Sequence, residues 1–311
     1  FKKSRIFELT AALDIASMTV RNRLRPSPEL ALCIVLWRMS FPSRWKDACE
    51  SFGRSETYLS IVFTDTVHYL ATQFGWLVSW HPRLRSRRRM NSFARAIEDA
   101  GAGGKIWGFV DGHFQGFCKP SKGQRLQYTG HKKAHGCKYQ AIVTPDGLIS
   151  SLIGPFNGSD NDWSMYLQSG VARRLRRLAA RNKHMLYLYG DPAYHSSFGV
   201  MAPFKHHRGR HFLTPEQKRF NKHLSSLRIS VEHAFGETTR KWTYNTFSKQ
   251  LYVGKQAVGQ FFIVSTLLTN CYICMEGRNQ TSDKYMYSPP SLEEYLCLDC
   301  ESSGEEPSDI N

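Results

Sequence analysis

Three carboxylates occupy positions from which they could hold metal ions. Asp111 directly follows a short apolar run, Asp191 follows a second one after a glycine, and Glu232 lies in a stretch with helical spacing. Carboxylate oxygens are preferred ligands of Mg²⁺ and Mn²⁺. Two such ions about 3.5–4 Å apart can activate an attacking oxygen and stabilise a leaving oxygen in phosphodiester cleavage. These acids predict a two-metal site if the fold brings them together.

Each acid also has an ordinary structural interpretation. Asp191 precedes a proline and is a suitable helix N-cap, and Asp111 precedes a glycine and suits a turn. Glu232 lies four residues after Arg228 and can pair with it along one helix. The chain has 26 acids, so such a triple can also arise by chance. Spacing alone leaves both interpretations open.

The elements that must position the acids begin near residue 105. Apolar alternation and turn signals predict strands and helices in the following order: strands 106–110, 138–144 and 148–153, helix 162–181, strand 185–189, a His-rich basic insertion at 195–226, and helices 226–242 and 256–275. Three strands, a helix, a fourth strand and an acid-bearing helix are the order of an RNase H-like core. We therefore expect an α/β fold with a mixed-sheet catalytic core and a helical insertion.

An all-α region precedes this core. A short helix is expected from Arg44 to Phe52, stopped by Gly53, and a second helix from Glu56 to about Ala71, capped by Ser55. This is the pattern of a helix-turn-helix unit. An ordinary pair of antiparallel helices is the alternative.

The charge distribution favours a polyanionic partner. Lys and Arg number 42 against 26 acids, and residues 1–275 contain 40 of those bases with only 17 acids. Such a body attracts nucleic acid or an acidic membrane surface. No apolar run of roughly 18 residues predicts a membrane span, and the sequence does not open with a signal-peptide pattern, although it can be a fragment of a longer chain. We expect DNA as the partner, no membrane, a reducing compartment and nuclear localisation.

Two sets of arginines are candidates for phosphate contacts. The candidates are Arg83, Arg85, Arg87, Arg88 and Arg89 in one cluster, and Arg173 and Arg177 on the expected helix 162–181. A solvated surface, or a localisation signal for the cluster, is the alternative. Two CxxC pairs, Cys271 with Cys274 and Cys297 with Cys300, approximate zinc-ribbon spacing. Buried cysteines acting as small apolar residues are the alternative to zinc.

Three motifs around the acids resemble those of a known family. They are Val110-Asp111-Gly112, Gly190-Asp191-Pro192-Ala193-Tyr194 and Ser230-Val231-Glu232-His233-Ala234-Phe235-Gly236. They are similar to the acid motifs of PIF/Harbinger transposases and Harbinger-derived nucleases. Further similar words, such as Lys138-Tyr139-Gln140 and Thr214-Pro215-Glu216, extend the resemblance from about Phe41 to Tyr295.

The resemblance implies a DDE-type nuclease of RNase H-like fold that binds two Mg²⁺ or Mn²⁺ ions through Asp111, Asp191 and Glu232. Such enzymes cut at the ends of a DNA element, with water as nucleophile, and then join the freed 3′-hydroxyl to a new site. A separate Myb-like accessory protein is a plausible partner, and a homo-oligomer is left open. The alternatives are a domesticated or inactive DNA-binding protein that keeps the fold and, less favoured by the motifs, an RNA-directed nuclease.

Two positions depart from the family pattern. His113 stands where a threonine is common, and Asp160-Asn161-Asp162 stands where His-Asp is often found. Asp162 still matches the family's aspartate and is expected to support the metal ligands or to cap a helix. The predicted organisation is an N-terminal helical segment (1–40), a helix-turn-helix-like region (41–80), a basic linker (81–104), the nuclease domain (105–275) and an acidic, flexible tail (276–311).

Overall fold

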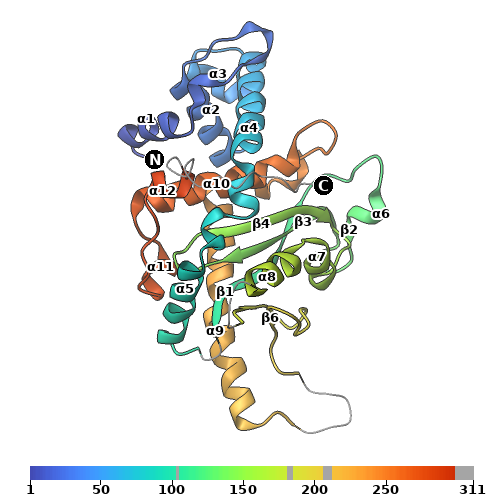
Figure 1. Ribbon diagram of the computed structural model, residues 1–311. Coiled ribbons are helices and arrows are strands. Elements are labelled where there is room, and N and C mark those ends of the chain that lie inside the picture. Colours follow the sequence, from blue (N-terminus) through green and yellow to red (C-terminus); the bar gives the residue numbers. More distant parts are fainter. Residues whose placement is uncertain (103–104, 181–184, 206–211, 298–311) are drawn as a thin grey trace.

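The computed structural model describes residues 1–102, 105–180, 185–205 and 212–297. Helices of the N-terminal region lie at one end, a mixed sheet lies in the middle, and a long helix extends from the other end (Figure 1). The N-terminal helices are α1 (Lys3–Ala12), α2 (Pro28–Ser40), α3 (Trp45–Phe52) and α4 (Glu56–Ser79). The fold is mixed α/β, as the sequence predicts.

The sheet combines antiparallel and parallel pairing around a central strand. Its strands are β1 (Ile106–Gly116), β2 (Tyr128–Thr129), β3 (Ala134–Val143), β4 (Ile149–Asn157), β5 (Tyr187–Tyr189) and β6 (Val200–Met201). β1 lies between β3, which is antiparallel to it, and β5, which is parallel to it. β4 and the short β2 pair with β3, and β6 pairs in parallel with β5.

The first strand is longer than expected. The sequence predicts that it ends at Asp111, because Asp-Gly is a common turn pair. Instead β1 continues to Gly116, and its segment 111–116 pairs with residues 136–141 of β3. Asp111 therefore lies within a paired strand, and the expected break at Gly112 was wrong.

Helices cover both faces of the sheet. One face packs against α5 (Arg87–Asp99), α7 (Asp162–Gln168) and α8 (Val171–Ala180) through the apolar cluster that contains Trp107 and Val110. The other face packs against α4, α9 (Pro215–Lys241) and α10 (Val258–Glu276) through the cluster that contains Phe109 and Tyr139. Ile106 and Phe109 of β1 thus belong to one core and Trp107 and Val110 to the other, with a register shift between Ile106 and Gly108.

Two predicted helices differ in extent from the observed ones. The expected helix 162–181 is divided into α7 and α8 at Gly170, whose φ of +70° places it in the left-handed region. α9 begins at Pro215 rather than near 226, because Thr214 caps it and forms a reciprocal capping box with Gln217. Residues 195–205 and 212–226 of the expected insertion thus contribute β6 and the first turns of α9, and residues 206–211 lie outside the described part.

The helical pair near the N-terminus agrees with the prediction. Gly53 ends α3 with a φ of +60°, and the Ser55 hydroxyl accepts a hydrogen bond from the Tyr58 amide at the start of α4. α4 is longer than expected and runs from the N-terminal helices down to the sheet (Figure 1). Trp45 of α3 packs edge-on against Phe63 of α4. These apolar residues belong to the same cluster as Phe109 of β1.

The expected linker and tail are partly folded. Within 81–104, α5 buries Met90, Phe93 and Ile97, so this part is a packed helix rather than a linker. Within 276–311, α11 (Gln280–Lys284) is followed directly by the buried Tyr285, and α12 (Leu292–Leu296) contains the buried Tyr295. The expectation of a flexible tail was therefore wrong for 280–296. Residues 298–311, with the acidic end of the chain, lie outside the described residues. The domain boundaries otherwise stay predictions.

α10 is a core helix. Its length and a mean hydropathy of 1.5 would suffice to cross a membrane, yet 72% of this stretch is buried inside the protein. It packs against α4, α9, α12 and β4. The short helix α6 (Gln124–Gln127) completes the α-helices among the described residues.

Candidate active site

Asp111 lies within β1, and Asp191 lies two residues after the end of the adjacent parallel strand β5. Phe109 of β1 pairs with Tyr189 of the parallel strand β5, and each acid lies two residues beyond this pair. Neighbouring strands are about 4.8 Å apart, and residues two apart face the same side. The sheet therefore brings the two acids to one edge, where the charge of Asp191 acts on Asp111.

Arg228 joins Glu232 to this edge. One guanidinium nitrogen lies 2.6 Å from the Asp111 Oδ2, and the other lies 3.0 Å from the Glu232 Oε1. Arg228 precedes Glu232 by one helical turn on α9, the spacing at which helical side chains meet. Glu232 thus forms the helical ion pair with Arg228 and, through the same guanidinium, is also held near Asp111.

Asp162 lies against the same strand. It is the first residue of α7, whose N-cap is the side chain of Asn161. A β-carbon on Gly112 would come within 2.4 Å of the Asp162 Oδ1, so only glycine at 112 allows this approach. Burial raises the pKa of Asp162, the negative charge of Asp191 raises it further, and Lys138 opposes both. Asp162 is therefore part of the acid cluster, and the residue that caps α7 is Asn161 rather than Asp162.

The electrostatics of Asp111 reflect this crowding. Burial raises its pKa from 3.8 to about 6, and the charges of Asp191 and Asp162 act in the same direction. Arg228 and the Gly112 amide, which donates to the Asp111 Oδ1 at 2.9 Å, lower the pKa. The effect of burial on the pKa of Asp111 therefore outweighs the opposing effect of its ion pair with Arg228.

Tyr194 and Gln140, two neutral residues near the acids, were not assigned a role from the sequence. Tyr194 is fully buried and its hydroxyl accepts a hydrogen bond from the Gln140 Nε2 at 3.2 Å. Burial, then the charges of Asp162 and Asp111, raise the pKa of Tyr194 well above its usual value. Both residues lie in sequence motifs that resemble the family, and this was the only sign in the sequence that they could have a role. Tyr194 is therefore a neutral phenol that lies close to the acid cluster.

His113 is a packing residue. Its ring stacks on Phe262 with centroids 4.4 Å apart and lies 4.8 Å from the ring of Phe235. Burial, assisted by the charge of Lys132, lowers its pKa to about 4, so the imidazole is neutral at physiological pH. The departure from the family pattern at this position is therefore accommodated between α9 and α10.

The donor chemistry of the cluster fits a hard divalent cation. Asp111, Asp162 and Asp191 influence one another electrostatically, and crowded carboxylates favour a cation. In the present arrangement, no three His, Cys, Asp or Glu side chains among the described residues lie close enough to hold one ion. Two of the carboxylates are instead bound to Arg228. Metal binding would thus require side-chain movement.

The candidate DNA-contacting arginines fall into different environments. Arg87 and Arg88 on α5 are exposed, as are Arg173 and Arg177 on α8. Arg89 is half-buried and donates to the Tyr287 hydroxyl at 3.5 Å. The side chain of Arg85 lies outside the described part of the structure.

Arg83 does not belong to the exposed set. Its guanidinium lies 3.2 Å from the carboxylate of Asp146, which is fully buried, and its own side chain is only 12% exposed. This internal ion pair corrects the expectation that Arg83 contacts DNA phosphate.

The cysteines that the structure describes do not form a zinc site. Cys271 and Cys274 are buried in α10, where burial raises the pKa of both thiols, whereas zinc binds thiolates. Cys297 follows α12 and is half-buried, and Cys300 lies outside the described residues. The four-cysteine zinc site stays a prediction.

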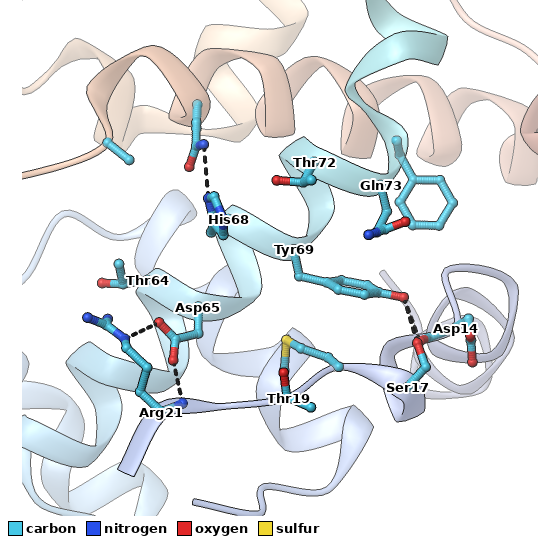
Figure 2. Close-up of a pocket in the computed structure, with 14 residues that line it drawn as sticks. Asp14, Ser17, Thr19, Arg21, Thr64, Asp65, His68, Tyr69, Thr72 and Gln73 are labelled. Atoms are coloured by element: carbon cyan, nitrogen blue, oxygen red, sulfur yellow. Dashed lines mark hydrogen bonds and ion pairs between the residues drawn. The ribbon is translucent and has the colours of Figure 1, made fainter. Parts of the chain in front are cut away.

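A pocket of about 840 Å³ lies away from the acids, between α4, the segment 14–21 and the start of α10 (Figure 2). Asp65 of α4 accepts hydrogen bonds from the Arg21 amide and Nε, and the Tyr69 hydroxyl contacts Ser17. These bonds fasten the N-terminal segment along α4. Residues 64–73 of the second helix of the predicted helix-turn-helix are therefore partly covered.

The comparisons with known proteins give one family. The sequence profile of the DDE superfamily endonuclease family matches residues 110–270, which include all three acids of the predicted triad and span just over half of the 311 residues. No curated protein and no solved structure matches the chain. On this match, the chain belongs to the DDE superfamily endonuclease family.

Proposed function

We propose that the protein is a divalent-metal-dependent DNA endonuclease and transposase of the PIF/Harbinger type, with Asp111, Asp191 and Glu232 as its metal ligands. The observation that carries the proposal is the matched placement of Asp111 and Asp191 beyond the parallel pair of β1 and β5, with Glu232 joined to Asp111 through Arg228. The order of β1, β3 and β4, then α7 and α8, then β5 and the acid-bearing α9 supports an RNase H-like core, with the short α6, β2 and β6 lying between these elements. The family match supports DNA as the substrate.

The chemistry follows from the acids. When bound, Mg²⁺ or Mn²⁺ would activate the attacking oxygen and stabilise the leaving oxygen of the phosphodiester. The carboxylates of Asp111 and Asp191 would hold the cations at the sheet edge, and Glu232 would complete the set from α9. Asp162 and Tyr194 would keep these ligands in place. Cleavage would use water, and strand joining would use the freed 3′-hydroxyl of the DNA.

The DNA would approach over the face that carries α5 and α8. Both helices pack on the same side of the sheet as α7, which supplies Asp162. Their exposed arginines are Arg87, Arg88, Arg173 and Arg177. The α3–α4 pair would add a second DNA contact through the exposed start of α4. Nuclear localisation and a Myb-like accessory protein belong to the same proposal and are supported by the basic charge and the motif resemblance.

A domesticated DNA-binding protein without strand transfer is the second candidate. It is favoured by one observation, namely that Arg228 forms ion pairs with two of the three acids in the present arrangement. The presence of all three acids at one sheet edge favours the enzyme instead.

The test is cleavage of a DNA that carries the terminal repeats of the source element. The wild-type protein is expected to cut it in Mg²⁺ or Mn²⁺ and not in EDTA. Asp191→Asn is expected to lose at least about 100-fold in rate, because it removes a metal ligand. Asp99→Asn, an exposed acid at the end of α5, is the matched control and should cut normally. Equal cutting by wild type and Asp191→Asn would exclude the role given to Asp191.

A further inference from the structure

Arg228 links two elements through one guanidinium. It binds Asp111 on β1 at 2.6 Å and Glu232 on α9 at 3.0 Å. The side chains of Arg228 and Asp111 are only 20% and 17% exposed, so their ion pair is partly withdrawn from water. A guanidinium is a rigid fork of donors that suits two carboxylate oxygens at once. This geometry is more specific than a surface ion pair.

The guanidinium occupies the space that a cation shared by these carboxylates would need. Two positive charges a few ångströms apart in a partly buried site repel strongly. The carboxylate oxygens that accept from Arg228 also cannot keep those hydrogen bonds and turn toward an ion. Arg228 and a divalent cation are therefore competitors for Asp111 and Glu232.

We propose that Arg228 is the counter-cation of the metal-free acid site, and that binding of a divalent cation requires release of its guanidinium from Asp111 and Glu232. This inference rests on the proposed metal-binding role of the acids. The Glu232 side chain is 56% exposed, which leaves it free to reorient without displacing α9. Arg228 acts as a positioning residue: it keeps the acids together before metal arrives and sets the free-energy cost of loading the site.

A metal-binding measurement tests the competition. Mn²⁺ is titrated into the full chain without DNA, and free Mn²⁺ is read from its EPR signal. Arg228→Gln is expected to bind Mn²⁺ about tenfold more tightly than the wild type, because a nearby positive charge is removed. Arg219→Gln is the matched control. Arg219 lies on the same helix but is exposed and pairs with Glu216 at the surface, so its loss should leave the affinity unchanged.

A second measurement uses the wild-type protein and so does not depend on folding of the variant. The ¹⁵N–¹H signal of the Arg228 Nε, assigned by its absence in Arg228→Gln, is followed during addition of Mg²⁺. The signal is expected to shift with the same midpoint as metal binding. A signal that stays unchanged at saturating Mg²⁺ would overturn the inference.

The two proposals fail in different ways. If neither protein binds Mn²⁺, the proposed metal site itself is wrong, and the inference on Arg228 falls with it. If the wild type binds Mn²⁺ and Arg228→Gln binds it equally or more weakly, the metal site stands and only the competition is refuted. Tighter binding by Arg228→Gln with a shifting Arg228 signal supports both.

Discussion

Asp162 lies so close to Gly112 that a β-carbon on residue 112 would approach the Asp162 Oδ1 to 2.4 Å. The same β-carbon would meet the Met165 Cε at 3.1 Å. The absence of a side chain at this position of β1 is thus what lets α7 deliver its acid to the strand that carries Asp111.

Gly112→Ala should therefore push Asp162 and the start of α7 away from β1. Crowding of this kind costs roughly 1–3 kcal/mol of the free energy of unfolding, and it should weaken Mn²⁺ binding as well. Both are measured by urea unfolding and by Mn²⁺ titration. Gly75→Ala in α4 is the control, since its β-carbon meets only the Ile263 Cγ2 at 3.9 Å. It should stabilise the protein by about 0.5–1 kcal/mol, and a similar gain at Gly112 would contradict the close approach.

The raised pKa of Asp111 makes metal binding depend on pH. Because its pKa is about 6 in the folded chain against an ordinary 3.8, the folded state holds the proton more tightly. The stabilising contribution of Asp111 is therefore fully present below about pH 4 and is lost as the pH rises through about 6. Metal binding needs the ionised carboxylate, so the opposite trend is expected for the metal.

The rise in Tm caused by Mg²⁺ should accordingly be small at pH 5 and full at pH 7.5, as measured by differential scanning fluorimetry. Asp111→Asn should show little rise at either pH. A rise in Tm of equal size at both pH values in the wild type would mean that ionisation of Asp111 does not control Mg²⁺ binding.

Tyr194 should matter through its hydroxyl. Tyr194→Phe removes the acceptor of the Gln140 Nε2 and leaves a buried donor without a partner, which costs roughly 1–3 kcal/mol of the free energy of unfolding. Chemical denaturation measures this loss. Tyr128→Phe, at an exposed tyrosine, should change stability little. Equal stability of Tyr194→Phe and the wild type would show that the bond between these two side chains contributes nothing.

DNA binding should be strongly salt-dependent. If 6–10 phosphates are contacted, affinity should fall on the order of 10³–10⁵-fold between 50 and 200 mM salt. Arg87→Gln and Arg173→Gln should each reduce the salt slope by about 0.9, as measured by fluorescence anisotropy. Arg278→Gln, at an exposed arginine outside α5 and α8, is the control. Unchanged salt slopes in both variants would show that the DNA does not bind the face that carries α5 and α8.

Local signals in the sequence predicted several elements correctly. The Gly53 stop and the Ser55 cap define the turn between α3 and α4, because each acts through its own backbone geometry. The apolar runs before Asp111 and Asp191 likewise predicted two strands, observed as β1 and β5. These features depend on residues close in sequence.

Long-range contacts account for what the sequence did not show. The strand β1 passes through Gly112 because β3 pairs with it and Asp162 fills the space above it. The region 280–296 is folded because Tyr285 and Tyr295 are buried against helices distant in sequence. The Arg228–Asp111 pair joins residues from α9 and β1, and helical spacing alone pointed only to Glu232.

A crystal structure of the protein soaked in Mn²⁺, with the anomalous signal used to locate the ions, tests whether the three acids hold metal. We expect anomalous peaks at the edge formed by β1 and β5, with oxygens of Asp111, Asp191 and Glu232 roughly 2–2.3 Å from them and with Arg228 turned away. Manganese bound elsewhere, with these three acids unligated and Arg228 still between Asp111 and Glu232, would show that the acids are not its ligands.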